Sequence, residues 1–488
     1  MDRPEHTDPP EVLLRRHFGY PAFRPLQSRV LAAVAEGRDV LAVLPTGGGK
    51  SVCFQIPALM RTGPTVVLSP LISLMQDQVS QARARGLPAA AVNSALSDRE
   101  QRDVLGQIVC GEVRLVYTSP ERLARLAGDL DRLAVRPSLL AVDEAHCISE
   151  WGPEFRPAYR GLRRLRRALG WPQVIALTGS ATPAVRLDIT RSLGLGGRSL
   201  GKESRESRLV LGSFNRPNLW FGVARIASER ERLAALLAVL RLKDGLAIVY
   251  APTRGSVEEL ARVLFEAGFR SAPYHAGLGP AVRKDVLRRF LEGDLQVVVA
   301  TCAFGMGIDK PDVRVVVHWT LPSTPESYYQ EAGRAGRDGR FARCVLLYRE
   351  GDGEFLRRTV NTTDHTRRRE VLGRIEVMER YACERSCRRR ALLRYFGERL
   401  PRCAGCDICG RGGPRPLSSA ISDRRLVRLR AALGTRGTPW GGCVLEPEVL
   451  RRLADSPPTD ERALAAVEGV GPVLAGHYSK TIFEALAP

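Results

Sequence analysis

The feature that most constrains the fold is a short apolar run followed at once by a glycine-rich loop. Residues 40–44 are typical of a buried strand, three consecutive glycines follow, and the sequence from Ser51 onward has a helical pattern. A strand, such a loop and a helix together form a phosphate-binding loop, in which Lys50 reaches the outer phosphates and the Ser51 hydroxyl binds Mg²⁺. The residues that we expect to hold the nucleotide here are Thr46, Gly47, Gly48, Gly49, Lys50 and Ser51.

The loop departs from the usual pattern at Leu44, where a glycine is expected, so a chance glycine-rich turn is an alternative. The scarcity of lysine favours the functional interpretation, because most of the 74 basic residues are arginines. A lysine at position 50 indicates a compact point charge for which arginine is no substitute.

A second apolar run, residues 139–142, ends in the acidic pair Asp143 and Glu144. Such a pair can simply mark the start of a helix. Together with a phosphate loop it predicts nucleotide hydrolysis, with Asp143 in the Mg²⁺ shell and Glu144 orienting or deprotonating the attacking water.

The bulk composition points to a polyanionic partner. The chain has 488 residues, a net charge of +21 and a pI near 10.1, which favours nucleic acid, although an arginine-rich proteome would give the same bias. No apolar run is long enough to predict a membrane span. The charged N-terminus does not resemble a signal peptide, so we expect a cytoplasmic protein. Five cysteines between Cys383 and Cys409 indicate a metal site rather than disulfides.

Short apolar runs alternate with helical stretches from residue 38 to about 200, and the same rhythm resumes after a glycine-rich segment at 195–201. This alternation predicts two α/β domains, each with a parallel sheet. Beyond residue 353 the sequence becomes helical and strongly basic.

Seven segments then carry a family resemblance: Phe18–Gln27, Ser69–Gln78, Thr118–Arg122, Thr178–Thr182, Tyr274–Leu278, Ala300–Asp312 and Gln330–Gly339. In this set and order the chain resembles the RecQ family of ATP-dependent DNA helicases, within superfamily 2, from residue 12 to about 410.

The resemblance implies two tandem RecA-like parallel-sheet domains of the α/β class, a helical zinc-binding subdomain and a small all-α C-terminal domain similar to the HRDC domain. The expected ranges are 1–200 and 201–352 for the RecA-like domains, 353–412 for the zinc-binding subdomain, 413–422 for a linker and 423–488 for the last domain.

Two further groups of nucleotide-site residues follow from the resemblance. The first group would recognise adenine, the amide reading its edge and the aromatic and guanidinium stacking on its faces: Tyr20, Arg24 and Gln27. Alone, this segment is equally a helix start with a satisfied glutamine. The second group would act from the second domain, with Arg337 as the arginine finger, Arg334 on the γ-phosphate and Gln330 near the attacking water. The alternative is two surface arginines in a glycine-rich loop.

An aromatic-rich loop follows the acidic pair and resembles the segment that couples DNA binding to ATP hydrolysis in the family. Its DNA-binding candidates are Trp151, Phe155 and Arg156, because aromatic and guanidinium faces stack on exposed bases. Glu150 and Pro153 replace the glutamine and histidine usual in the family, and the aromatics could instead pack on the second domain.

The cysteine cluster predicts a closed site of four thiolates, which is typical of structural zinc. The family pattern selects Cys387, Cys403, Cys406 and Cys409 as ligands. Cys383 is the rival ligand, and an iron–sulfur cluster is the chemical alternative.

The family usually carries a winged-helix domain between the zinc site and the HRDC domain, but only about 13 residues separate Cys409 from Asp423. The resemblance implies a 3′→5′ DNA helicase of repair and recombination, lacking the winged helix, with ATP, Mg²⁺ and Zn²⁺ as cofactors. We expect single-stranded and forked DNA as partners, a single-strand-binding protein as a candidate protein partner, a monomer, and no membrane. The alternatives are an ATPase that remodels RNA or protein–nucleic acid complexes without processive unwinding, and a non-catalytic nucleic-acid scaffold.

Overall fold

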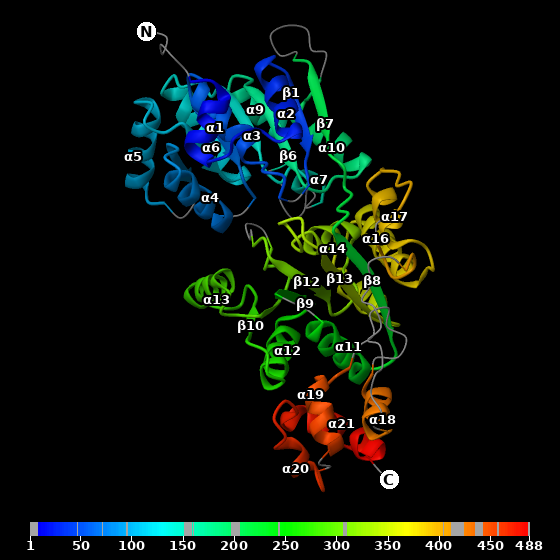
Figure 1. Ribbon diagram of the computed structural model, residues 1–488. Coiled ribbons are helices and arrows are strands. Elements are labelled where there is room, and N and C mark those ends of the chain that lie inside the picture. The colour runs from blue at the N-terminus through cyan, green and yellow to red at the C-terminus, as the bar shows by residue number, and fades with distance from the viewer. Residues whose placement is uncertain are drawn as a thin grey trace. The chain divides into compact units, whose positions relative to one another are not determined.

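The structure is a computed structural model, drawn in Figure 1. It describes residues 8–45, 47–70, 72–93, 96–150, 159, 161–196, 205–242, 245–305, 310–403, 405–410, 424–434, 443–455 and 458–486. The chain divides into two compact units, Met1–Phe214 and Asn215–Pro488.

The first unit is built on a parallel sheet to which the described residues contribute seven strands, in the spatial order β3-β4-β2-β5-β6-β1-β7. The strands are β1 (Asp39–Val43), β2 (Thr65–Leu68), β3 (Ala89–Val92), β4 (Leu115–Thr118), β5 (Leu139–Val142), β6 (Gln173–Thr178) and β7 (Ser207–Leu211). Every residue of β1, β2, β4, β5 and β6 is buried. Both faces of the sheet are therefore covered, which explains the unbroken apolar runs in the sequence.

Helices precede and connect these strands. They are α1 (Pro10–Phe18), α2 (Pro25–Ala35), α3 (Val52–Met60), α4 (Ile72–Ala84), α5 (Asp98–Val109), α6 (Pro120–Arg132), α7 (Cys147–Glu150), α9 (Leu162–Ala168) and α10 (Pro183–Leu193). Local sequence sets several of the ends: the Ser97 and Thr182 side chains accept hydrogen bonds from the first turns of α5 and α10. Gly19 and Gly194 end α1 and α10 in the left-handed conformation.

Strand β7 lies beyond residue 200, the expected end of the first domain, yet it pairs with β1 from Asp39–Ser207 to Val43–Leu211. The first sheet therefore extends past the expected boundary. In the sequence, the glycine-rich segment at 195–201 separates the two predicted α/β domains, but the chain returns to the first sheet after it, with β7. The exact domain limits otherwise remain predictions.

The second unit also has a parallel sheet, with six strands among the described residues in the order β10-β11-β9-β12-β13-β8. They are β8 (Leu219–Ile226), β9 (Leu246–Tyr250), β10 (Ser271–Tyr274), β11 (Val297–Ala300), β12 (Val313–His318) and β13 (Ala342–Arg349). Its connecting helices are α11 (Glu229–Arg241), α12 (Arg254–Glu266), α13 (Pro280–Glu292) and α14 (Pro325–Ala332).

Two helical regions follow in the same unit (Figure 1). The first contains α15 (Asp352–Thr359), α16 (His365–Cys383) and α17 (Arg388–Tyr395), and the second contains α18 (Arg424–Leu433), α19 (Pro447–Asp455), α20 (Glu461–Ala465) and α21 (Gly471–Leu486). The predicted fold class is confirmed: two parallel-sheet RecA-like domains and a helical zinc-binding region, with a C-terminal segment whose described elements are helices.

The cysteine-rich loop after α17 adds to the edge of the second sheet. Cys406 forms an isolated parallel bridge with Phe221 of β8. The backbone N–H of Asp407 donates to the Phe221 carbonyl over 3.0 Å, and the Asp407 carboxylate accepts from the N–H of Val223 over 3.2 Å. This loop therefore satisfies part of the free edge of β8.

The C-terminal helices share an apolar cluster with α11 and α12. Tyr478 of α21 donates its hydroxyl to the Arg230 carbonyl over 3.0 Å, and the Arg230 guanidinium lies 4.8 Å from the centre of the Tyr478 ring. The cluster and these polar contacts join the last helices to the second sheet domain.

Candidate functional site

The first unit gathers polar residues at one edge of its sheet. Strands β1, β2, β5 and β6 are parallel, so the segments that follow them emerge at the same edge. These segments are the glycine-rich loop, the Ser69 region, the Asp143–Glu144 pair and the loop after Thr178. Ligands of open parallel sheets bind at the carboxyl ends of the strands, so this edge is the candidate nucleotide site.

The glycine-rich loop leads directly into α3, with Ser51 at the N-cap position and no cap hydrogen bond from its side chain. Gly49 has a φ of 70°, and a β-carbon there would lie 2.4 Å from the Gln27 amide nitrogen. Glycine is therefore required both by the backbone and by the close approach of Gln27. Thr46 lies outside the described residues.

Lys50 and the acidic pair meet in this site. The Lys50 ammonium donates to Glu144 Oε1 over 2.9 Å, with 16% and 21% of the two side chains exposed. Asp143 accepts at Oδ2 from the Gln78 amide over 2.7 Å and at Oδ1 from the backbone N–H of Glu144 over 3.0 Å. Glu144 has a φ of 45°, an unusual value for a residue other than glycine and one that clusters at functional sites.

The two carboxyl groups have opposite pKa shifts. Burial, followed by the negative charge of Glu144, raises the pKa of Asp143. Burial also acts to raise the pKa of Glu144, but the charges and hydrogen bonds of Lys50 and His146 outweigh it and hold that pKa well below its usual range. The pair thus contains one carboxylate that is firmly ionised and one that is neutralised more easily.

His146 links the acidic pair to the next strand. One of its ring nitrogens, Nδ1, lies 3.3 Å from Glu144 Oε2 and 3.0 Å from the Thr178 hydroxyl oxygen. The Thr178 hydroxyl in turn donates to the Ser180 carbonyl over 3.1 Å. A chain of polar contacts therefore connects Glu144 to the loop after β6. Gln78, His146 and Thr178 were not among the predicted site residues, although Gln78 and Thr178 lie in segments that carry the family resemblance.

The residues expected to recognise adenine lie beside the phosphate loop. Gln27 is 4% exposed, donates to the Gly49 carbonyl over 3.1 Å and accepts at Oε1 from the Arg24 N–H over 2.9 Å. Arg24 donates to the Gly47 carbonyl, and the Tyr20 side chain is exposed. Gln27 and Arg24 therefore hold the loop's backbone, and their contact with adenine remains a prediction.

In the second unit, the loop 333–340 carries the predicted arginine finger. Gln330 lies in the last turn of α14, Arg334 is buried and Arg337 is half-buried. The α14 helix is tied to the end of β12 by His318, whose Nε2 lies 2.9 Å from Glu331 Oε2. The roles of these three predicted residues remain predictions.

The four predicted metal ligands come together. Their sulfur atoms all lie within 4.8 Å of one another, and those of Cys387 and Cys406 are 3.9 Å apart. Zn–S bonds of about 2.3 Å in a tetrahedron require sulfurs about 3.8 Å apart, so the cluster fits a structural zinc ion. This set is Cys387, Cys403, Cys406 and Cys409, and the rival Cys383 is exposed and outside it.

Two arginines next to Cys387 fix the metal loop. Arg388 pairs with Asp407 over 3.1 Å, both side chains being at most 6% exposed. Arg389 is 1% exposed and donates to Asn215 Oδ1 over 3.0 Å as well as to backbone carbonyls, including that of Gly405 in the cysteine loop. The zinc site is thus connected to the first residues of the second unit.

The predicted DNA-binding residues Trp151, Phe155 and Arg156 lie outside the described residues. The same holds for Pro153. Among the helices of the described chain, none is long and apolar enough to cross a membrane.

Comparisons with known proteins place these features in families. Residues 24–189 match the DEAD/DEAH box helicase model, 229–339 the helicase conserved C-terminal domain, and 350–410 the RecQ zinc-binding model. Among solved structures, Saccharomyces cerevisiae Dbp5 bound to RNA and ADP BeF3 superposes with a TM-score of 0.57 at 17% identity, covering 75% of this chain and 92% of that one. This likeness shows the fold.

Curated relatives are more similar in sequence. The ATP-dependent DNA helicase RecQ of Haemophilus influenzae is 41% identical over 401 residues, covering 81% of this chain and 63% of the relative. The Bacillus subtilis RecQ is 41% identical over 406 residues, with 83% and 66% covered, so the chain spans about two thirds of the length of these relatives. The Bacillus subtilis protein named "Probable ATP-dependent DNA helicase RecS" is 39% identical over 387 residues, covering 79% of this chain and 75% of the relative. The chain belongs to the RecQ family of helicases.

Proposed function

We propose that this protein is an ATP-dependent DNA helicase that moves 3′→5′ on single-stranded DNA and opens duplexes during repair and recombination. The observation that carries the proposal is the Lys50–Glu144–Asp143 cluster beside the glycine-rich loop of a RecQ-family chain. The curated relatives named as DNA helicases and the net charge of +21 support DNA as the partner.

In the proposed reaction, the Lys50 ammonium leaves Glu144 and binds the phosphates of ATP. Glu144 then has a free oxygen with which to orient a water molecule in line with the γ-phosphorus, while His146 keeps its other oxygen engaged. Asp143 and Ser51 would hold Mg²⁺, which neutralises charge that develops on the phosphates. Water adds to the γ-phosphorus as the bond to the bridging oxygen of ADP breaks, the proton that the water loses passes to a phosphate oxygen, and inorganic phosphate leaves.

The roles of the second unit and of the DNA loop belong to the same proposal. Arg337 would stabilise the transition state as an arginine finger, with Arg334 on the γ-phosphate and Gln330 near the water. Trp151, Phe155 and Arg156 would stack on unpaired bases. The zinc cluster would support the helical platform beside the second sheet.

We further propose forked and single-stranded DNA as substrates, a monomeric enzyme acting in the reducing cytoplasm, and a single-strand-binding protein as a partner. None of the eleven cysteines, all of which lie among the described residues, forms a disulfide, and this supports a reducing compartment. Since about 13 residues separate Cys409 from Asp423, we infer that this chain grips duplex DNA without a winged helix at that place.

The test is unwinding of DNA duplexes that carry either a 3′ or a 5′ tail, with ATP, and of matched RNA duplexes. We expect opening of the 3′-tailed DNA alone, and none by Lys50→Ala, which keeps single-strand binding. DNA-stimulated hydrolysis without strand separation on any duplex would support the remodelling ATPase instead.

A further inference from the structure

The segment that opens the second unit makes unusual contacts with the loop 333–340. Arg216 is the second residue of this unit. Its guanidinium donates to three backbone carbonyls of the loop: Gly333 over 3.2 Å, Ala335 over 3.1 Å and Gly336 over 2.7 Å. In sequence these acceptors lie 117 to 120 residues away. The chain is therefore pinned to this loop where it enters the second unit.

The three carbonyls suit the spread N–H donors of a guanidinium. Gly333 is the C-cap of α14, where the carbonyl oxygens carry partial negative charge and lack helical donors. The Arg216 guanidinium donates to these three backbone oxygens, and burial lowers its pKa. A planar fork reaches three acceptors at fixed positions, whereas the single ammonium of lysine does not.

Asn218 holds the same loop two residues further on. Its amide donates to the Gly336 carbonyl over 2.8 Å and to the Arg340 carbonyl over 2.9 Å. Gly336 has a φ of 54°, and a β-carbon there would lie 2.5 Å from the Asn218 amide nitrogen. The contact between Asn218 and the loop therefore leaves no room for a side chain.

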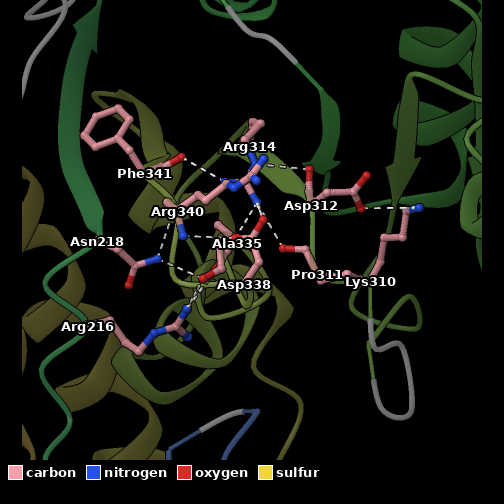
Figure 2. Close-up of polar contacts among 11 residues, drawn as sticks. Arg216, Asn218, Lys310, Pro311, Asp312, Arg314, Ala335, Asp338, Arg340 and Phe341 are labelled. Atoms are coloured by element: carbon pink, nitrogen blue, oxygen red, sulfur yellow. Dashed lines mark hydrogen bonds and ion pairs between the residues drawn. The ribbon is translucent and has the colours of Figure 1, made fainter.

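Arg314 of β12 fixes the far end of the loop, as Figure 2 shows. It binds both oxygens of Asp338, over 2.7 and 2.8 Å, and donates to the carbonyls of Pro311 and Phe341 over 3.0 and 3.2 Å. With Arg216 and Asn218 at the start and middle of the loop, both ends of the segment around Arg337 are held by side chains from elsewhere in the unit.

We propose that Arg216 and Asn218 are positioning residues for the arginine-bearing loop. They hold the backbone from Gly333 to Arg340 so that Arg334 and Arg337 are presented in one geometry, and they set the rate of ATP turnover without touching the nucleotide. The expected effect on catalysis rests on the proposed function. The holding of the loop by Arg216 and Asn218, which we call the clamp, rests on the contacts alone. Since Arg216 is the second residue after the boundary between the units, the start of the second unit is anchored on the loop that carries Arg337.

The test uses the full chain and the variant Arg216→Lys, which keeps the charge but places all its N–H donors on one nitrogen. Because a misplacement of about 1 Å costs roughly 100-fold in rate, we expect kcat for DNA-stimulated hydrolysis to fall about 10- to 100-fold. The KM for ATP should stay within roughly threefold, since ground-state binding is not touched. Backbone hydrogen exchange in 333–340 should accelerate. The matched control is Arg270→Lys, an exposed arginine of the same unit that donates to the Asp294 carbonyl over 2.7 Å, and it should leave all three quantities unchanged.

Combination with Arg337→Ala separates positioning from general damage. If Arg216 acts through the loop that carries Arg334 and Arg337, adding Arg216→Lys to Arg337→Ala should cost less than it costs the wild type, whereas a full additional loss would overturn the proposal. Unchanged exchange in 333–340, or an unchanged kcat, would overturn it as well. Should Arg216→Lys fail to fold, Asn218→Ala gives the same readouts with the guanidinium kept. Normal turnover by Arg337→Ala alone would refute the finger, and the exchange data would still report whether the clamp exists.

Discussion

Replacing Glu144 with glutamine should tighten ATP binding while stopping hydrolysis. In the structure Lys50 donates to Glu144 Oε1 over 2.9 Å. The Lys50 side chain is 16% exposed and the Glu144 side chain is 21% exposed. In the proposed function, the phosphates of a nucleotide would therefore compete with Glu144 for the same ammonium. Glutamine keeps the shape and the acceptor oxygen but removes the charge that makes this competitor strong.

The magnitude follows from the two kinds of hydrogen bond. A bond to a charged group is worth about 1.5–3 kcal/mol and a neutral one about 0.5–1.5 kcal/mol, so the competing interaction weakens by about 1–1.5 kcal/mol. Since 1.4 kcal/mol is tenfold in affinity, Glu144→Gln should bind ATP about 5- to 10-fold more tightly. Hydrolysis should fall by orders of magnitude because water is no longer oriented by a carboxylate.

The assay is equilibrium binding of a non-hydrolysable ATP analogue with Mg²⁺, so that slow turnover cannot distort the comparison. Asp143→Asn is the matched control, because it removes the same charge from the adjacent residue, whose partner is Gln78 rather than Lys50. We expect that variant to bind the Mg²⁺-nucleotide more weakly. Unchanged or weaker binding by Glu144→Gln would refute the competition, and equal tightening in both variants would assign the effect to net charge.

Three further outcomes are expected. Arg337→Ala should bind ATP normally but hydrolyse it at least about 10³-fold more slowly; near-normal turnover would remove the finger assignment. Cys406→Ser should contain no zinc by metal analysis and should unfold at a lower temperature, because the binding energy of a structural site is also folding energy. A wild-type protein that lacks zinc but keeps full stability would contradict this. Partial burial acts to raise the pKa of Asp338, but hydrogen bonds from Arg314 and the Arg340 backbone lower it overall. The ionised Asp338 carboxylate thus contributes stability above about pH 4, and this contribution is lost as the pH falls through the lowered pKa. In denaturant unfolding, the difference in stability between wild type and Asp338→Asn should therefore shrink below about pH 4.

The parts of the site that are local in sequence could be predicted. The glycine-rich loop and the Asp143–Glu144 pair each follow an apolar strand within a few residues, so pattern alone indicates their chemistry. The pairing of Gln78 with Asp143 and the path from Glu144 through His146 to Thr178 depend on the order of strands in the sheet. The spacing of residues in the sequence does not reveal that order.

The contacts that the sequence did not reveal are longer in range. Strand β7 joins β1 across more than 160 residues of chain, after a glycine-rich segment that is typical of a linker. Arg216 donates to carbonyls about 117 residues away, and a backbone acceptor leaves no sequence signal. The cysteine ligands were selected by family resemblance, because spacing alone left Cys383 as a rival.

The bridge between Cys406 and Phe221 has a consequence for solubility. Strand β8 is apolar along most of its length and ends the second sheet, with β13 on its inner side. An uncovered edge of this kind presents unpaired N–H and carbonyl groups to any other strand, including the same strand in another molecule. The metal loop occupies part of that edge through Cys406 and Asp407. Loss of zinc would therefore loosen the subdomain and also expose the unpaired N–H and carbonyl groups of the β8 edge. Such an edge can pair with a strand of another molecule, which leads to aggregation.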